Sequence, residues 1–227
     1  MNLVILVFPD VTQLDFTAPL EILSRFDGIR PHIVWKDIQP VRAGDGLQIL
    51  PSVDFASCPP ADILLVPGGR GQLALMEDEE TLNFLRLQAK GAKYITSVCT
   101  GSLVLAAAGL LGGYRATSHW QSLHQLALFG AEPVDRRIVI DGNRITAAGV
   151  TAGLDFALQL GSILCGEEQA RRVQLAVEYD PQPPFDCGSR ERADRRLVAE
   201  LVRRTSDFQQ RREQSARRAA LRLGRAK

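Results

Sequence analysis

The stretch YITSVCTGSLVLAAAG, residues 94–109, decides the fold of this chain. Its first part, Tyr94 to Val98, is largely apolar and β-branched, which predicts a buried strand. Its last part, Ser102 to Ala108, is rich in leucine and alanine and predicts a buried helix that Gly109 ends. Cys99 lies at the junction of the two elements. A strand that runs at once into a helix is typical of α/β folds.

Cys99 has small neighbours at Ser97 and Gly101, which is the pattern of a nucleophile elbow with cysteine in place of the usual serine. Small residues are needed there because the strand and helix backbones crowd together around a strained turn. The thiol would stand at the helix N-terminus, whose N–H groups and dipole stabilise a thiolate, so a reactive cysteine of low pKa is expected. The alternative is a structural cysteine buried at a strand end, because free cysteine is among the most buried residue types.

The same alternation of strand and helix extends over most of the chain and predicts a mainly parallel sheet with helices on both faces. Strands are predicted at residues 2–8, 31–36, 61–66, 94–98 and 114–118, with short strands around the turn at 44–46 and a hairpin at 136–148. Helices are predicted at residues 20–26, 79–90, 102–108, 149–164 and 167–179, and another opens at 119.

Asp15 lies at or just before the start of the first helix, because Pro19 is tolerated only in a helix's first turn. Two interpretations are equally open. Thr12 and Asp15 are spaced like a capping box at a helix N-terminus. Alternatively, Asp15 stands between Leu14 and Phe16 as a buried carboxylate at the carboxyl end of the first strand, where open α/β sheets place their sites.

A glycine turn, Pro67-Gly68-Gly69-Arg70-Gly71, follows the strand at residues 61–66. Backbone N–H groups at such a turn can stabilise developing negative charge, and a plain tight turn is the alternative. The segment is not a phosphate-binding loop, because no Gly-Lys-Ser/Thr follows and GxGxxG spacing is absent. Since Asp15, this turn and Cys99 each follow a strand, they are expected to gather at one edge of the sheet.

Composition excludes several classes of protein. The chain has 227 residues with 45% hydrophobic residues, 23% charged residues and a net charge of +1, which is typical of an ordinary globular protein without a field that would attract nucleic acid or a membrane. Cys58, Cys99, Cys165 and Cys187 form no CxxC pair, so no zinc or redox motif is present and reduced thiols in the cytoplasm are expected. Asp10 interrupts the N-terminal apolar run, which argues against a signal peptide, and no apolar run approaches the ~20 residues of a membrane span.

Residues 186–227 differ in composition from the rest. They hold twelve Arg and one Lys against six Asp and Glu, a net charge of +7 against −6 for residues 1–185. This contrast predicts a catalytic domain over residues 1–185 and an Arg-rich helical extension over residues 186–227. The extension is expected to pack on the acidic body or on a second subunit, with nucleic-acid contact as the alternative. It lacks the pair of helices around a glycine turn that a helix-turn-helix requires.

These motifs resemble the ThiJ/PfpI superfamily, whose members have a flavodoxin-like sandwich and a reactive cysteine on an elbow. The chain is similar to the isocyanide hydratase branch over nearly its whole length. The elbow and the glycine turn mark the superfamily, and Asp15 together with Thr100 marks the branch. Peptidase-like members have histidine at the position of Thr100, which puts a Cys–His pair in doubt. The stretches that carry the resemblance are 13–17, 67–69, 96–105, 116–120, 150–158 and 172–185.

The resemblance implies a reaction and a role for each site residue. Cys99 would attack an isocyanide to form a covalent thioimidate, and Asp15 would act as general acid and then base, releasing an N-substituted formamide without a metal or organic cofactor. Thr100 would orient Asp15, and the backbone N–H groups of Gly69 and Thr100 would stabilise charge on the adduct. The apolar neighbours of Asp15 suggest an apolar substituent, and a homodimer is implied. The residues expected beside the pocket are Gly68, Val150 and Thr151.

Two other functions are compatible with the sequence. Similar elbows occur in sensor domains of AraC-type regulators, which would predict salt-dependent DNA binding through the Arg-rich extension. A different thiol hydrolase or a glyoxalase-type enzyme would use Cys99 on amides or dicarbonyls. His119 is interpreted as a structural residue at a helix entry, with a catalytic base as the alternative.

Overall fold

The structure is a computed structural model that describes residues 1–225, and a seven-stranded sheet forms its centre. The strands of this sheet are, in spatial order, β10 (Ile138–Asp141), β11 (Arg144–Ala147), β7 (Tyr94–Val98), β6 (Ile63–Val66), β1 (Asn2–Leu6), β2 (Arg30–Trp35) and β5 (Val53–Asp54). All neighbours in it pair in parallel except the hairpin of β10 and β11. Two short pairs lie outside it, β3 (Val41–Arg42) with β4 (Gln48–Ile49), and β8 (Arg115–Ala116) with β9 (Glu132–Pro133).

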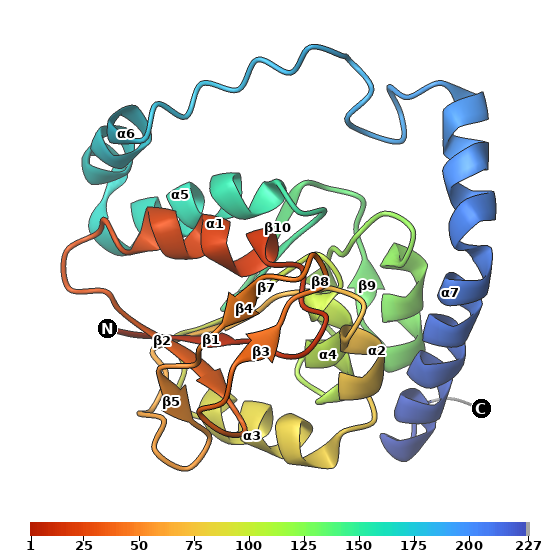
Figure 1. The fold of residues 1–227 in the computed structure, drawn as a ribbon, viewed down its shortest axis with the longest axis horizontal. Helices are drawn as coiled ribbons and strands as arrows, with labels where there is room; N and C mark the ends of the chain where they lie inside the picture. The colour runs from red at the N-terminus through yellow and green to blue at the C-terminus, as the bar shows by residue number, and fades with distance from the viewer. Residues whose placement is uncertain (226–227) are drawn as a thin grey trace.

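Helices cover both faces of the sheet. Their bounds are α1 (Leu14–Leu23), α2 (Gln72–Leu75), α3 (Glu79–Ala89), α4 (Gly101–Ala107), the 3-10 helix η1 (Leu123–Phe129), α5 (Ala152–Cys165), α6 (Glu167–Ala176) and α7 (Arg195–Arg222). Figure 1 shows α1 and α5 side by side on one face, and α2, α3 and α4 on the other. The predicted α/β sandwich with a mainly parallel sheet is therefore confirmed.

The centre of the sheet is built from strands that are apolar on both faces. Residues 3–6 of β1 and 63–66 of β6 are fully buried, because helices cover each side of the sheet. These strands and β7 lie next to one another and run in the same direction, so their carboxyl ends meet at one edge. The predicted hairpin at residues 136–148 and the turn at 44–46 are also present.

Two predicted helix starts are wrong. The first helix begins at Leu14 and not at 20, so Pro19 lies inside it and Asp15 occupies its first turn. A proline at that depth removes one backbone hydrogen bond, and packing against α5 compensates for the loss. His119 opens no helix, because residues 119–122 form a turn before η1 begins at Leu123.

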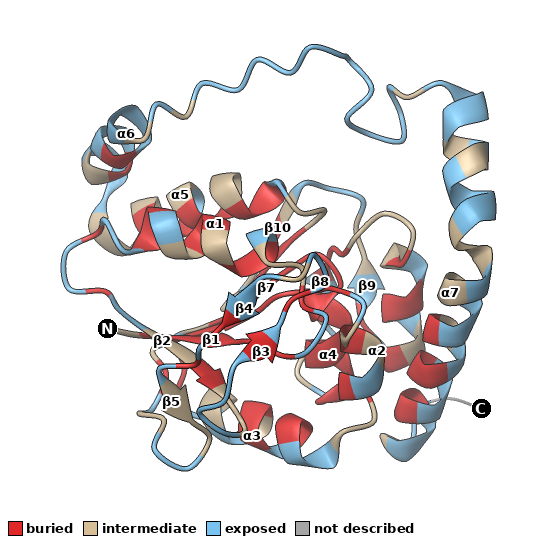
Figure 2. Cartoon of the chain, viewed as in Figure 1, coloured by how far each residue is buried: buried red, intermediate tan, exposed pale blue. Residues whose placement is uncertain are grey.

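Within the Arg-rich extension, residues Arg195–Arg222 form the long helix α7, which lies along one side of the body next to η1, α2 and α4 (Figure 1). The Asp194 carboxylate caps its start by accepting from the N–H of Arg196 at 2.6 Å. Its C-terminal half is buried towards the body, whereas its first turns are mostly exposed (Figure 2). Nη2 of Arg218 lies 2.6 Å from Oε1 of Glu77, and this ion pair joins the positively charged extension to the acidic body. No helix within residues 1–225 is long and apolar enough to cross a bilayer.

Candidate active site

Cys99 stands at the predicted elbow between β7 and α4. Its φ of 58° lies in the left-handed region, which is uncommon for a residue with a side chain and marks a strained turn. Its own N–H donates to the carbonyls of Ala147 and Ala148, at 3.0 and 2.7 Å, which holds the turn against the end of β11. The structure explains why the residue at position 101 must be glycine: a Cβ there would lie 2.0 Å from the carbonyl oxygen of Val66. Close packing of α4 on β6 therefore fixes the direction of the thiol.

Asp15 is a fully buried carboxyl group in the first turn of α1. It does not cap the helix, so the structure decides between the two interpretations in favour of the buried carboxylate. Its Oδ2 accepts a hydrogen bond from the N–H of Gly68 at 2.9 Å, while its Oδ1 has no partner within residues 1–225. Burial raises the pKa of Asp15 to about 7, against the lowering effects of the Gly68 N–H and of Cys99. The carboxyl group is thus able to gain and lose a proton near neutral pH.

The glycine turn brings Asp15 and Thr100 together. A Cβ at Gly68 would lie 2.6 Å from both N and Oγ1 of Thr100 and 3.0 Å from Oδ2 of Asp15, so only glycine leaves space for both groups. The hydrogen bond expected from Thr100 to Asp15 is not among those of residues 1–225. Instead, Oγ1 of Thr100 accepts from the N–H of Gly69 at 3.3 Å. The Gly69 N–H is therefore engaged in positioning Thr100, and it is not a free donor to an adduct.

The thiol of Cys99 is buried, and burial raises its pKa, as does the negative charge of Asp15. The backbone N–H of Thr100 and the guanidinium of Arg212 act in the opposite direction. The low thiol pKa predicted from the elbow is therefore wrong, because the loss of solvent outweighs the effect of the helix N-terminus. Asp15 raises the pKa of Cys99 and Cys99 lowers that of Asp15, so the two groups titrate as a coupled pair, which holds one proton above pH about 7.

A pocket of about 260 Å³ opens above Cys99. Thr100 and Val150, both predicted near the site, line it, whereas Thr151 lines the adjoining pocket. The side chains and backbone that line the pocket belong to Thr12, Gly69, Arg70, Cys99, Thr100, His119, Gln121, Val150, Arg204, Thr205, Phe208, Gln209 and Arg212.

Helix α7 contributes residues to this pocket that the sequence analysis did not assign to the site. Phe208 and Arg212, which are one helical turn apart, line the pocket together with Cys99. The sequence does contain a signal for this face, since a stripe of small residues at helical spacing follows Arg212. That stripe, buried in the structure, comprises Ser215, Ala216, Ala219 and Ala220.

His119 lines the pocket but carries no positive charge at neutral pH. Burial lowers its pKa to about 4, and the charge of Arg212 adds to the effect. Its Nδ1 accepts from the N–H of Gln121 at 3.4 Å, which holds the ring at the turn. This contact agrees with the structural interpretation of His119.

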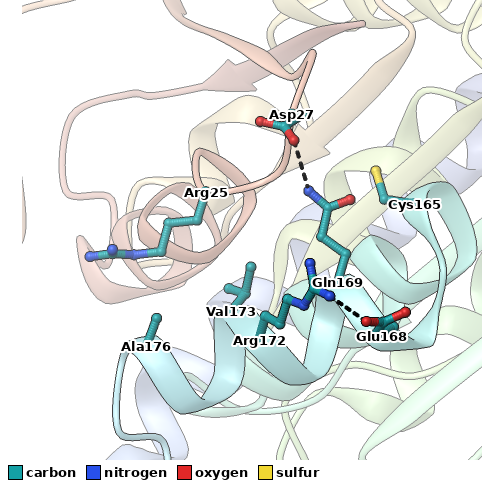
Figure 3. Close-up of a pocket in the computed structure, with 8 residues that line it drawn as sticks. All are labelled: Arg25, Asp27, Cys165, Glu168, Gln169, Arg172, Val173 and Ala176. Carbon is teal, nitrogen blue, oxygen red and sulfur yellow. Dashed lines mark hydrogen bonds and ion pairs between the residues drawn. The ribbon is translucent and has the colours of Figure 1, made fainter.

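A second cleft lies far from the elbow, between the end of α1 and α6 (Figure 3). Cys165 stands at its edge, and Gln169 donates across it to Asp27 at 3.4 Å. Neither Cys99 nor Asp15 lines it. Although this cleft is larger than the pocket above Cys99, it lacks the pair of reactive groups, so the candidate site is the smaller pocket.

Comparisons with known proteins find matches over most of the chain. A family model described as the DJ-1/PfpI family matches residues 1–162. The isonitrile hydratase of Pseudomonas putida is 50% identical over 218 residues, which are 96% of each chain. The crystal structure of a ThiJ/PfpI family protein from Pseudomonas syringae has a TM-score of 0.93 and 43% identity, over 95% of this chain and 90% of that one. Both matches extend beyond residue 162 into α7.

A transcriptional regulator shares part of the chain. The HTH-type transcriptional regulator GbdR of Pseudomonas aeruginosa is 36% identical over 164 residues, which are 70% of this chain but 43% of the regulator. More than half of that regulator therefore has no counterpart in this match.

Proposed function

This chain belongs to the DJ-1/PfpI family, and from that membership together with the Cys99–Asp15 pair we propose that it is an isocyanide hydratase. It converts R–NC and water to an N-substituted formamide. The observation that carries the proposal is the buried Asp15 carboxyl group, which is electrostatically coupled to the thiol and whose Oδ1 has no hydrogen-bond partner within residues 1–225. The 50% identity to an isonitrile hydratase over nearly the whole chain supports the same substrate class.

The first step is the addition of the thiol across the isocyanide carbon. Asp15 takes the proton of Cys99, and the sulfur attacks the terminal carbon of R–NC. The same proton then passes from Asp15 to that carbon, which gives the thioimidate R–N=CH–S–Cys99 and leaves the Asp15 carboxylate. A group whose pKa is about 7 suits this task, since it both accepts and returns a proton near neutral pH.

The second step is hydrolysis of the thioimidate. The Asp15 carboxylate draws a proton from water as the water oxygen attacks the carbon, and this proton reaches the nitrogen. The adduct R–NH–CH(OH)–S–Cys99 then breaks its C–S bond, and Asp15 takes the hydroxyl proton. R–NH–CHO leaves, and the pair again holds one proton. The Thr100 N–H, which lowers the thiol pKa, stabilises negative charge on sulfur during both steps.

The test is the reaction of the purified protein with a simple alkyl isocyanide, with the formamide measured by mass spectrometry. We expect formamide from the wild-type protein, none from Cys99→Ala, and at least about a hundredfold slower formation by Asp15→Asn. Cys165→Ala is the matched control, because its thiol lies in the other cleft, and it should retain the wild-type rate. Equal rates for wild type and Cys99→Ala would reject the proposal.

The partial match to GbdR supports a second candidate, a ligand-sensing protein on the same fold. Within residues 1–225, α7 is the one helix of the extension, and it packs on the body, which does not favour DNA binding. A sensor would bind isocyanide or another ligand without turnover and would bind DNA in a salt-dependent way. Formamide production without DNA binding distinguishes the enzyme from the sensor.

We also propose that the enzyme is a cytoplasmic homodimer. The resemblance to the hydratase branch implies the dimer. The location is supported by the four cysteines, which are all free in the structure.

A further inference from the structure

The pocket above Cys99 carries more positive charge than hydration of an isocyanide requires. Arg70, Arg204 and Arg212 line it, and no Asp or Glu among residues 1–225 does. The reaction at the isocyanide carbon uses a thiol and one proton, which Cys99 and Asp15 supply. The arginines therefore point to a different part of the substrate.

Arg212 is a buried guanidinium without a carboxylate partner among residues 1–225. It is 6% exposed, and its hydrogen bonds go to neutral groups. Nε donates to Oε1 of Gln72 at 2.9 Å, and Nη1 donates to Oγ of Ser122 at 2.9 Å and to Oε1 of Gln209 at 3.2 Å. These bonds fix the plane of the guanidinium and leave Nη2 without an acceptor in this part of the chain. A buried charge is costly unless it is paired, so this geometry suits an incoming anion.

Arg70 also lines the pocket and extends its positive surface. Its guanidinium carbon lies 5.5 Å from the centroid of the Phe208 ring, and that of Arg212 lies 4.6 Å from it. The ring therefore serves as a common platform for a guanidinium from the glycine turn and one from α7. Arg70 forms no ion pair within residues 1–225, whereas Arg204 lies 3.6 Å from Glu200.

The positive charge in the pocket shifts the pKa values of Arg212 and His119. Burial lowers the pKa of Arg212 to about 10, the charge of Arg70 lowers it further, and a negative Cys99 acts to raise it. The same guanidinium contributes to the low pKa of His119. At neutral pH the pocket therefore contains the charged Arg212 and a neutral His119.

We propose that Arg212 and Arg70 form a carboxylate subsite, and that the physiological substrate is an isocyanide whose substituent bears a carboxylate. Nη2 of Arg212 and the guanidinium of Arg70 can each donate to an oxygen of one carboxylate, in charge-assisted hydrogen bonds. Because the pocket is only about 260 Å³ and also contains Cys99, the carboxylate stands a few bonds from the isocyanide nitrogen. This inference rests on the proposed function, and it makes α7 part of the substrate site.

The test compares isocyanoacetate with its methyl ester, which is a neutral molecule of similar shape. The wild-type enzyme should have a kcat/KM at least about tenfold higher for the carboxylate, a difference in line with one hydrogen bond to a charged group. In Arg212→Gln and in Arg70→Gln this ratio should fall towards one. Arg211→Gln is the matched control, because Arg211 also lies near Phe208, at 5.6 Å, but does not line the pocket. Its ratio should remain that of the wild type.

Three outcomes would overturn the carboxylate subsite while leaving the proposed function intact. The first is a wild-type ratio of the two kcat/KM values near one, and the second is an unchanged ratio in Arg70→Gln. The third is a fall in kcat/KM in Arg212→Gln that is equal for the carboxylate and the ester. The last outcome would show that Arg212 acts on the Cys99 thiolate. Because Arg70 is exposed, its variant should fold even if Arg212→Gln does not.

A binding measurement separates the subsite from the chemistry. N-formylglycine, the product of isocyanoacetate hydration, should bind the wild-type protein by calorimetry at least about tenfold more tightly than its methyl ester, and Arg70→Gln should remove the difference. This result is independent of turnover. If no isocyanide were hydrated and N-formylglycine still bound preferentially, the proposed function would fail and the subsite would stand.

Discussion

At Asp15, burial and hydrogen bonding act on the carboxyl group in opposite directions. Burial favours the neutral form, and the Gly68 N–H and Cys99 favour the charged form. Burial is the stronger influence, which moves the pKa from 3.8 to about 7. The same environment that prepares this residue for proton transfer also makes its charged form a cost to the folded state.

The stability of the fold should therefore depend on Asp15 and pH. Between pH 3.8 and about 7 the unfolded chain has lost the Asp15 proton while the folded chain retains it, so the free energy of unfolding falls as pH rises through this window and is level above it. In Asp15→Asn the free energy of unfolding should not fall in this way, because asparagine has no proton to lose. We expect the variant to be more stable than wild type at pH 8, by up to about 4 kcal/mol for a shift of about three pKa units, and the gain to disappear at pH 4. Urea unfolding at both pH values measures it, and a gain of equal size at both would contradict the raised pKa.

The pH dependence of catalysis follows from the same pair. Below pH about 7 Asp15 is protonated and cannot accept the proton of Cys99, whereas above it the pair holds the single proton that the mechanism needs. We expect kcat/KM for a neutral isocyanide to rise with pH to a plateau, with an apparent pKa of about 7. Asp15→Asn should lose this inflection along with most of its activity. A kcat/KM that falls from pH 6 to pH 8 would exclude the role given to Asp15.

At the scale of elements, the elbow depends on how closely α4 approaches β6. The carbonyl oxygen of Val66 occupies the place of a side chain at Gly101, whereas a Cβ at Gly91 would meet nothing within 4 Å. These two glycines therefore form a natural comparison, since neither has a positive φ.

Gly101→Ala should destabilise the fold by at least about 1–3 kcal/mol, as overpacked sites do, and should reduce activity because α4 must move and shift Cys99. Gly91→Ala should change stability by less than about 0.5 kcal/mol. Thermal unfolding and the rate of formamide production measure both effects. Two variants of equal stability would show that the elbow does not require this contact.

At the scale of the whole molecule, α7 joins a distant part of the sequence to the active site. Its last turns are held against the body by Arg218, which pairs with Glu77, and by Arg222, which donates to the carbonyl of Met76 at 2.7 Å. Its first turns leave Leu197, Leu201 and Val202 at least 40% exposed. An apolar row of this kind is suited to a contact with a second copy of the chain.

The proposed homodimer predicts a mass of about 50 kDa, twice the 24.9 kDa of one chain, by light scattering coupled to size exclusion. Leu201→Glu should weaken the dimer if the exposed row of α7 contributes to it, because a charge would be buried in an apolar contact. Leu87→Glu is a control on α3, since Leu87 is exposed as well. A wild-type mass of about 25 kDa would contradict the dimer.

Most of the fold and the centre of the site could be predicted from local patterns in the sequence. Strand and helix alternation placed Asp15, Gly68 and Cys99 at one edge of the sheet, because strand ends meet whatever the connections between them. The direction of the pKa shift of the Cys99 thiol could not be predicted from local patterns, since it depends on burial by residues from many elements. The pocket wall was also missed, because Arg212 in an Arg-rich helix looks solvated until its packing on η1 and α2 is known.

The measurement that tests the central claim most directly is rapid-quench mass spectrometry of the intact wild-type enzyme mixed with an alkyl isocyanide. We expect an early species heavier than the protein by the mass of one isocyanide, located on Cys99 by peptide mapping, which forms and decays as formamide appears. Formamide released at the full rate while Cys99 carries no adduct, and while Cys99→Ala stays active, would contradict covalent catalysis at the elbow.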